Sequence, residues 1–204
     1  MLDAAIIEKC TDPSLTPAIV EQFIAAAGSS DPLAVTVKSG GRLILVPKAK
    51  TPDEALALIR QYVGQAVVRV GLTQFPAGVG IKDASELKPD LVDACENLRT
   101  GTKMFAKILR IVAKWYGNPT TKEVFPQIFE DAVYAWKTGE FEGVGVFQAE
   151  DPVEDSKIAQ PQTTNANEDV RGEADEDPPS TAKEHDNVGS AEMRIDLSHI
   201  GVEK

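Results

Sequence analysis

Residues 33–48, LAVTVKSGGRLILVPK, decide the fold class of this 204-residue chain. Two runs rich in β-branched residues flank Gly40 and Gly41, and paired glycines favour the tight turn of a β-hairpin. The next stretch, TPDEALALIRQYVG (51–64), has the cap and first-turn residues of a helix. QAVVRVGLTQF (65–75) then predicts a strand that joins the hairpin. The order β-β-α-β predicts an α+β fold built on a small antiparallel sheet.

Two amphipathic segments later in the chain predict an antiparallel helical hairpin that packs on this sheet. The first helix begins near Asp90 and runs to about Tyr116, where GNPT breaks it. The second ends near Trp136. It begins either at Thr120, where the spacing fits a capping box, or near Pro126, because proline is tolerated only in the first helical turn. A short connection between two amphipathic helices favours antiparallel packing.

Shorter segments complete the expected domain. Residues 3–10 and 16–28 predict two short helices from their apolar periodicity. Residues 139–149 predict a short edge strand through the alternating Val144 and Val146.

Charge divides the chain into parts. The whole chain has a formal net charge of -11, but residues 1–149 contribute about -1 and residues 150–204 about -10. All aromatic residues also precede residue 150, and a segment without them cannot easily build a core. We therefore expect a folded domain over 1–149, an acidic disordered linker over 150–192, and a short recognition segment over 193–204.

The N-terminus has no cationic region and only a short apolar run, which does not fit a signal peptide. No uncharged apolar stretch approaches the length that spans a bilayer. We expect a cytoplasmic protein without membrane insertion. In that compartment Cys10 and Cys95 are predicted to be reduced thiols that pack as small apolar residues.

Histidine usage limits the possible chemistry. His185 and His199, the two histidines of the chain, both lie in the acidic part. The expected domain therefore lacks a histidine-centred metal site and a Ser-His or Cys-His nucleophile. No carboxylate cluster has a diagnostic spacing, so we predict no catalytic residue, no metal and no cofactor.

The first predicted helix of the hairpin carries a basic face. At 100 degrees per residue, five cations fall within an arc of roughly 80 degrees and extend over about 22 Å. They are Arg99, Lys103, Lys107, Arg110 and Lys114. Three interpretations stay open for this basic face: a solvated surface, a site for DNA or another anionic partner, or a docking site for the protein's own acidic tail.

A glycine-containing loop is a weaker candidate site. QFPAGVGIK (74–82) contains Gly78 and Gly80 with Lys82 nearby, as in loops that bind phosphate. The loop lacks the third glycine of a dinucleotide-binding loop. It also lacks the Gly-Lys-Ser/Thr sequence that ends a P-loop. An ordinary turn is the alternative.

The acidic tail has its own alternatives. It is either a solubilising linker, a flexible tether, or a nucleic-acid mimic that competes for the basic face. Its last part, MRIDLSHIGV (193–202), alternates apolar and polar residues, which is typical of a segment recognised as a strand or an amphipathic helix. The recognition candidates are Met193, Ile195, Leu197 and Ile200.

Three stretches resemble the TraH family of conjugal transfer proteins from rhizobial and agrobacterial plasmids. They are DPLAVTVKSGGRLILVPK (31–48), QAVVRVGLTQFPAGVG (65–80) and KWYGNPTTKEVFPQIFEDAVYAWKTGEFEGV (114–144). The likeness covers about residues 1–149. It implies a part in plasmid conjugation and brings no known catalytic or binding residues.

These observations together predict a non-catalytic accessory protein of conjugative transfer. Its basic face is expected to contact a relaxosome or coupling component, or DNA. The alternatives are an enzyme with a carboxylate or glycine-loop site, and an adaptor or substrate of a type IV secretion channel that is recognised by its C-terminus.

Overall fold

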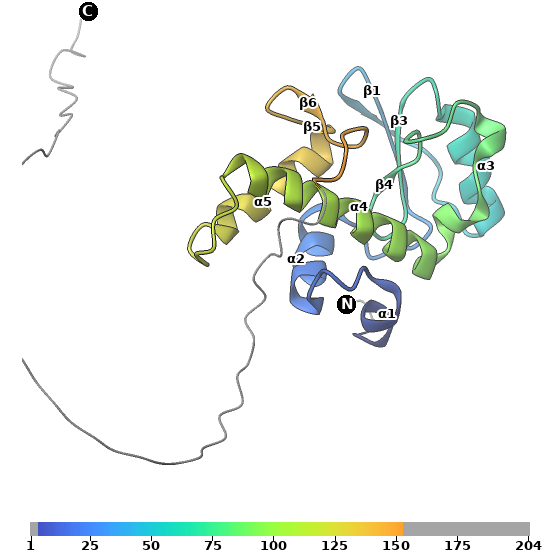
Figure 1. Cartoon of the computed structure of the whole chain (residues 1–204). Coiled ribbons are helices and arrows are strands. Elements are labelled where there is room, and N and C mark those ends of the chain that lie inside the picture. The colour runs from blue at the N-terminus through green and yellow to red at the C-terminus, as the bar shows by residue number, and fades with distance from the viewer. Residues whose placement is uncertain (1–3, 153–204) are drawn as a thin grey trace, which may run out of the picture. The chain divides into compact units, whose positions relative to one another are not determined.

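The computed structural model describes residues 4–152, and these form the predicted α+β fold (Figure 1). The main sheet has the order β2-β1-β3-β4, and all its pairs are antiparallel. The strands are β1 (Val35–Ser39), β2 (Arg42–Ile44), β3 (Val67–Val70) and β4 (Phe75–Pro76). Gly40 and Gly41 have φ angles of 55° and 77°, so the two-residue turn uses the left-handed conformation that glycine permits.

One face of the sheet packs against helix α3 (Pro52–Tyr62) and forms one hydrophobic cluster. The side chain of Thr51 accepts a hydrogen bond from the N–H of Glu54 at 3.2 Å, which confirms the predicted cap. The 3-10 helices η1 (Ala84–Glu86) and η2 (Pro89–Val92) follow the sheet, and η2 packs against α3.

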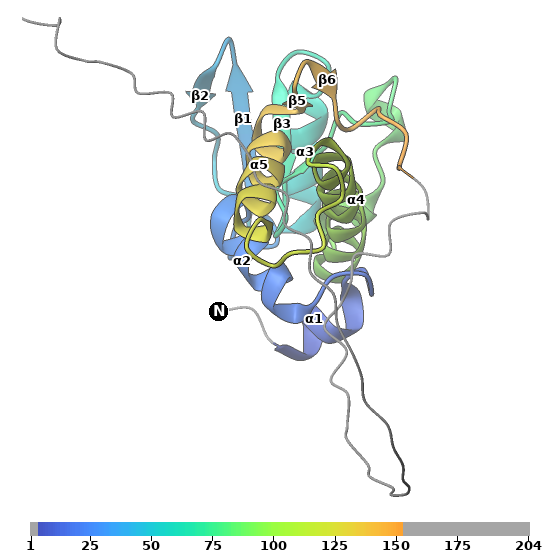
Figure 2. The same ribbon diagram turned by 60° about the vertical axis from the view of Figure 1, so that its left-hand side comes forward.

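A second hydrophobic cluster is built by helices from both ends of the domain (Figure 2). These helices are α1 (Ala4–Cys10), α2 (Pro17–Ala27), α4 (Ala94–Trp115) and α5 (Phe125–Thr138). The α4–α5 hairpin is the predicted one. Pro126 lies in the first turn of α5, so the later of the two predicted starts is confirmed and the capping box at Thr120 does not form.

The segment after α5 differs from its prediction. Instead of an edge strand of the main sheet, β5 (Glu140–Phe141) and β6 (Val144–Gly145) pair with each other as a separate two-stranded hairpin. Glu142 and Gly143 both have positive φ, and this tight turn sends the chain back on itself before it can reach the main sheet. Val146 follows the hairpin and is fully buried.

The two clusters meet at the turn between β3 and β4, which is held by the buried amide of Asn97. Its Oδ1 accepts hydrogen bonds from the N–H and the hydroxyl of Thr73, both at 3.0 Å. Its Nδ2 donates to the carbonyl oxygens of Val70 (3.1 Å) and Leu91 (3.0 Å). The indole N–H of Trp136 donates to the Thr73 carbonyl at 3.1 Å. Both helices of the hairpin therefore hold one turn.

This arrangement needs two close approaches that only glycine allows. A Cβ atom at Gly71 would lie 2.4 Å from Asn97 Nδ2, and one at Gly101 would lie 2.2 Å from Thr73 Oγ1. Residues 65–75 were predicted as one strand, and the turn at 71–74 divides them because Gly71 and Gln74 both adopt positive φ.

Arg69 connects the sheet to the C-terminal end of α5. Its guanidinium donates to the carbonyl oxygens of Gln74 (3.2 Å), Trp136 (2.6 Å) and Lys137 (3.0 Å). It lies 5.9 Å from the ring centroid of Trp136 and 5.8 Å from that of Phe147. Burial lowers the pKa of Arg69 to about 10. The helix C-terminus favours this cation because its free carbonyls carry partial negative charge.

The prediction of two reduced thiols is wrong for this structure, because Cys10 and Cys95 form a disulfide. Helix α1 packs across the first turns of α4 and brings the two Cα atoms within 5.0 Å. The prediction of thiols rested on the expected cytoplasmic location of the protein. Location does not indicate which residues far apart in the sequence become neighbours in the fold.

We predict that Asn97→Ala lowers the free energy of unfolding by about 2 to 4 kcal/mol, because it leaves several buried polar groups unsatisfied. Urea denaturation measures this effect. Gln61→Ala, at an exposed position on α3, is the matched control and is expected to change stability by less than about 0.5 kcal/mol. A loss at Asn97 no larger than that of the control would show that the turn is held by other contacts.

We also predict that reduction of the disulfide destabilises the fold, since the bond closes a loop with a sequence separation of 85. Such bonds typically contribute about 2 to 4 kcal/mol, and their loss lowers the melting temperature. Thermal unfolding with and without a reductant measures the change in the native chain. The Cys10→Ser/Cys95→Ser double variant is expected to be insensitive to reductant. Equal melting of the oxidised and reduced native chains would contradict this prediction.

Candidate functional site: the basic face of helix α4

Helix α4 carries all five cations of the basic face. Asp93 fixes its start, because its carboxylate accepts a hydrogen bond from the N–H of Glu96 at 2.9 Å. The opposite side of the helix is buried through Phe105, Ile108 and Val112, each with an exposed fraction of 0%. The cations therefore lie away from the hydrophobic cluster, and their surroundings differ along the helix.

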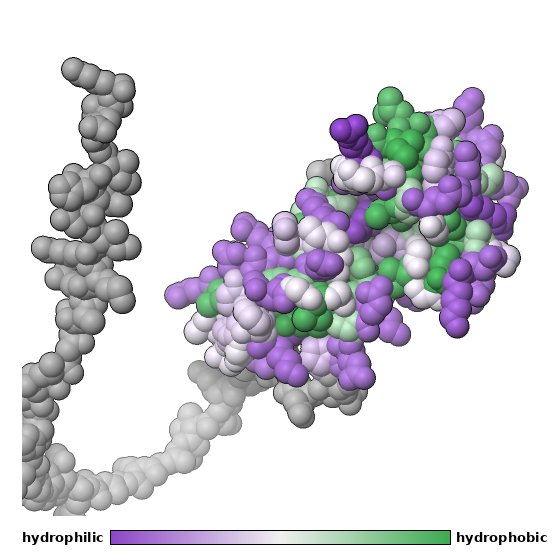
Figure 3. Space-filling view, turned by 90° about the horizontal axis from the view of Figure 1, so that it is seen from above, coloured by the Kyte–Doolittle hydropathy of each residue, from purple (hydrophilic) through white to green (hydrophobic). Residues whose placement is uncertain are grey.

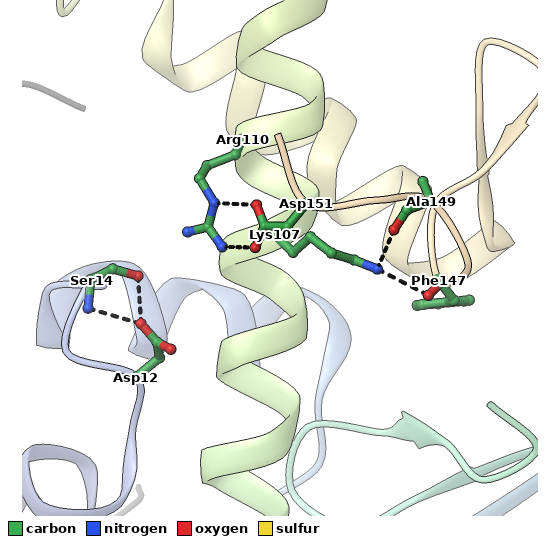
Figure 4. A network of polar contacts seen from close by, with 7 residues as sticks. All are labelled: Asp12, Ser14, Lys107, Arg110, Phe147, Ala149 and Asp151. Carbon is green, nitrogen blue, oxygen red and sulfur yellow. Dashed lines mark hydrogen bonds and ion pairs between the residues drawn. The ribbon is translucent and has the colours of Figure 1, made fainter. Parts of the chain in front are cut away.

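The middle of the basic face binds a segment of the same chain (Figure 4). Lys107 Nζ donates to the carbonyl oxygens of Phe147 and Ala149, both at 2.9 Å. Arg110 forms a two-point ion pair with Asp151, in which Nε lies 2.7 Å from Oδ1 and Nη2 contacts Oδ2. We name residues 147–151 the docked segment. Two of the five candidate cations are thus used to hold the point where the acidic part of the chain begins.

The charges of this contact support one another. Hydrogen bonds from Arg110 hold the pKa of Asp151 below its ordinary value, and the positive charges of Lys107 and Lys103 lower it further. The Asp151 carboxylate in turn raises the pKa of Arg110, with a smaller contribution from Asp12. Burial lowers the pKa of Lys107, and the charge of Asp151 opposes this effect. Arg110 and Asp151 therefore each stabilise the charged form of the other.

The two ends of the basic face are open. Arg99 forms an ion pair with Glu96, and its side chain is 52% exposed. Lys103 and Lys114 are exposed, and neither forms an ion pair within residues 4–152. Next to Lys114, the side chain of Trp115 is 64% exposed. It lies at the end of α4, where its ring packs edge-on against Phe141 at a centroid distance of 6.0 Å.

The glycine-loop candidates lie elsewhere in the domain. Gly78 and Lys82 line an open groove of about 910 Å³, together with Lys38 and Arg60. Gly80 has a φ of 77° but does not line the groove. The backbone N–H of Lys82 donates to a carboxylate oxygen of Glu86 at 3.0 Å, so this donor is already used. Phosphate binding at the loop stays a prediction.

Other candidates give less information. Met193, Ile195, Leu197 and Ile200 lie outside the described residues. Within the described part of the chain, no group of three or more His, Cys, Asp or Glu side chains is placed to hold a metal ion. The helices described here are too short or too polar to cross a membrane.

The sequence left docking of the acidic tail on the basic face as one of three interpretations, but it did not identify residues 147–151 as the segment that binds. The helical periodicity placed the cations on one face but could not show which part of the chain covers it. One signal was present: Phe147 is the last aromatic residue, and Asp151 follows shortly after it at the start of the acidic composition. In the structure the Phe147 ring packs edge-on against Trp136 of the hydrophobic cluster, and Asp151 pairs with Arg110 of the basic face.

We predict that Asp151→Asn loosens the docked segment, because Arg110 loses its charged partner. Amide exchange of residues 147–151 at neutral pH is expected to become about threefold to fivefold faster, as fits a partly exposed ion pair. Glu150→Gln removes a neighbouring exposed charge and is the matched control, with no expected change.

The pH dependence follows from the lowered pKa of Asp151. The stabilisation of the docked segment by the Asp151 carboxylate is fully present above about pH 4, the ordinary pKa of aspartate. It is lost as the pH falls through the lowered pKa of Asp151. The difference between the native chain and Asp151→Asn should therefore disappear in acid. A difference that is the same at pH 3 and pH 7 would show that the ion pair does not hold the segment.

Comparison with known proteins places this chain in a family. The TraH_2 family model matches residues 1–202. A relative from Sinorhizobium fredii (strain NBRC 101917 / NGR234), the "Uncharacterized protein y4dP", is 68% identical over 202 residues, which is 98% of this chain and 99% of that protein. No solved structure matches the chain. The chain belongs to the TraH_2 family, as the resemblance to the TraH conjugal transfer proteins indicated, and this membership supports a role in conjugal transfer.

Proposed function

We propose that this protein is a non-catalytic accessory component of conjugative plasmid transfer that binds an acidic protein surface through the open ends of the α4 basic face. The contact residues are Arg99, Lys103 and Lys114. The observation that carries the proposal is the division of the basic face into an occupied middle and two open ends. The partner is a relaxosome or coupling component, because these proteins share the process that family membership indicates.

Charge favours a protein partner over DNA. Affinity for a phosphate backbone rises with the number of cations that can reach phosphates, and two of the five, Lys107 and Arg110, already hold the docked segment. Carboxylates also stand along the same side of the helix. Glu96 pairs with Arg99, and Asp151 lies between the two open ends. These negative charges would repel phosphates that follow the helix, but a protein surface can place its acids beside the open ends alone.

The exposed indole of Trp115 adds an apolar contact next to Lys114. Tryptophan is enriched among the residues that dominate binding energy at protein interfaces. Trp115 is 64% exposed while its ring is held by Phe141, so it is partly fixed in place before a partner binds. A fixed aromatic side chain loses little conformational entropy on association.

We further propose that the protein acts in the cytoplasm, where the relaxosome assembles. A reducing cytoplasm would convert Cys10 and Cys95 to thiols. Helix α1 keeps other contacts with α4 in that state: the backbone N–H of Asp12, just after α1, donates to Thr102 Oγ1 at 2.9 Å, and Ile7 stays buried in the cluster. The basic face therefore does not depend on the disulfide alone for its position.

The test compares two double charge reversals in the full-length protein. Lys103→Glu/Lys114→Glu is expected to lower the frequency of plasmid transfer about tenfold or more, since ion pairs worth about 1.4 kcal/mol in total give that factor. Lys50→Glu/Lys122→Glu makes the same charge change at exposed positions outside α4 and should transfer normally. Pull-downs from plasmid-bearing cells should lose the same partner with the first variant and retain it with the second.

Nuclease treatment separates the protein-binding proposal from DNA binding. Capture of the partner is expected to survive nuclease. Loss of capture after nuclease, or salt-dependent binding of the purified protein to a duplex with a log-log slope near -3, would assign the basic face to DNA instead. If both double variants transfer the plasmid at the same frequency, the open ends of α4 are not needed for transfer, and the proposal is wrong.

A further inference from the structure

The open groove beside the glycine-containing loop is lined by three cations that the proposed function does not use. Lys38 lies on β1, Arg60 lies in the last turn of α3, and Lys82 lies in the loop between β4 and η1. All three residues are exposed. None of them forms an ion pair with another residue of the described part, 4–152. The groove therefore gathers positive charge that is available to a ligand.

The topology brings these cations to one end of the main sheet. Because β1 and β3 are antiparallel, Lys38 near the end of β1 lies opposite Val67 at the start of β3. Helix α3 leads into β3 through a turn at Gly64, whose φ is 82°, so Arg60 lies near the same end. Strand β4 runs antiparallel to β3 and continues into the loop that carries Lys82. Three separate elements thus supply one cation each to a single groove.

One carboxylate lines the same groove, and it already has a role in the fold. The side chain of Asp83 accepts a hydrogen bond from the N–H of Ser85 at 2.8 Å and caps η1. With three cations and one carboxylate, the lining has a formal net charge of +2. Neutral donors also line the groove, among them the hydroxyl of Ser39 and the side-chain amide of Gln148. A lining of this kind attracts anions that have several acceptor oxygens.

The groove also has an apolar wall. Val63, Val67, Val79 and Ile81 line it, and Val67 is 55% exposed. Lys38 and Val67 lie on the same face of the sheet, because residues directly opposite each other in neighbouring strands share a face. Figure 3 looks onto the domain from the top of Figure 1, and hydrophobic surface is exposed there among hydrophilic side chains. A ligand that carries an apolar body beside its negative charge would contact both kinds of surface.

We propose that this groove binds a nucleotide. Its phosphates pair with Lys38, Arg60 and Lys82, and its base and ribose cover Val67 and the neighbouring apolar residues. Three cations on separate elements fit an extended anion with several charges, because each cation pairs with a different phosphate oxygen. The volume of about 910 Å³ lies within the range of small-molecule sites, about 300 to 1,000 Å³. The groove is separate from the α4 basic face, so this inference goes beyond the proposed function.

The contact differs from that of a glycine loop that binds phosphate through its backbone. The N–H of Lys82 already donates to Glu86 at 3.0 Å. In the proposed site the side chains supply the charge, and two of the three cations come from outside the loop. The sequence pattern of residues 74–82 identified only Lys82, because Lys38 and Arg60 reach the groove through the fold.

Calorimetric titration of the full chain tests the proposal with three probes: adenosine triphosphate, inorganic triphosphate and adenosine. Adenosine triphosphate is expected to bind about tenfold or more tightly than either of the others, because it alone offers both the phosphates and the apolar body. Binding should weaken as salt is added, since screening reduces the attraction between charges. Absence of binding by adenosine triphosphate, or equal affinity for adenosine triphosphate and inorganic triphosphate, would overturn the proposal.

Matched charge reversals locate the phosphates. Arg60→Glu and, independently, Lys82→Glu should each lower the affinity for adenosine triphosphate about tenfold or more. Lys50→Glu makes the same charge change at an exposed position that does not line the groove. It precedes Arg60 by ten positions, about 15 Å along α3, and should leave the affinity within about twofold. Melting without ligand checks that each variant folds. Equal losses in the groove variants and in Lys50→Glu would overturn the proposal.

A substitution in the apolar wall separates the two parts of the contact. Val67→Ser should lower the affinity for adenosine triphosphate about threefold and leave that for inorganic triphosphate unchanged, because only the nucleotide covers this side chain. Val144→Ser, at a residue 51% exposed on β6 and outside the groove, is the matched control and should change neither. Equal losses of affinity for both probes in Val67→Ser would overturn the placement of the base.

The Lys103→Glu/Lys114→Glu variant separates this site from α4. It should bind adenosine triphosphate as the native chain does, so failure of the α4 proposal and failure of this one are separate results. Loss of nucleotide binding in that variant, with retention in Arg60→Glu, would assign the nucleotide to α4 and overturn the proposed site.

Discussion

The hydrogen bonds of the Asn97 side chain are the contact on which the rest of this domain depends. The turn between β3 and β4 enters the interior, where its backbone groups need partners other than water. Asn97 on α4 pairs with two of these backbone groups, the N–H of Thr73 and the carbonyl of Val70, and also with the Thr73 hydroxyl and the Leu91 carbonyl. Trp136 on α5 pairs with a third backbone group of the turn, the Thr73 carbonyl. The sheet–α3 cluster lies on one side of this turn and the helical cluster on the other. Without the network, the two clusters would share few specific contacts to fix their alignment.

The same constraint determines where the docked segment lies. Once the turn is held against α4 and α5, Arg69 of β3 reaches the last carbonyls of α5 and lies beside the rings of Trp136 and Phe147. The position of Phe147 then brings its carbonyl and that of Ala149 to Lys107, and Asp151 to Arg110. The docked segment is therefore the continuation of the helical cluster onto the surface of α4. Its position follows from packing as well as from charge.

Local signals made much of the fold predictable. Paired glycines marked the β1–β2 hairpin and Thr51 marked the start of α3, because turns and caps depend on residues next to them in the sequence. The missed features all join distant residues. Asn97 and Thr73 look like ordinary polar residues until the fold places them together, and the partners in the disulfide are separated by 85 positions. For the same reason, periodicity identified the basic face of α4 but not the docked segment that covers its middle.

The structure also changes the meaning of the charge asymmetry. The sequence predicts an acidic tail and a basic helix face, and it leaves open whether the two bind each other. The docked segment answers this for the first residues of the acidic region: a single carboxylate, Asp151, pairs with Arg110 and offsets part of the positive charge in the middle of α4. Lys103 and Lys114 keep their positive charge free of ion pairs within residues 4–152, because the docked segment pairs only with the middle of the helix. The charge asymmetry of the sequence is therefore partly resolved inside the described domain, and the proposed protein contact rests on the cations that this pairing leaves open.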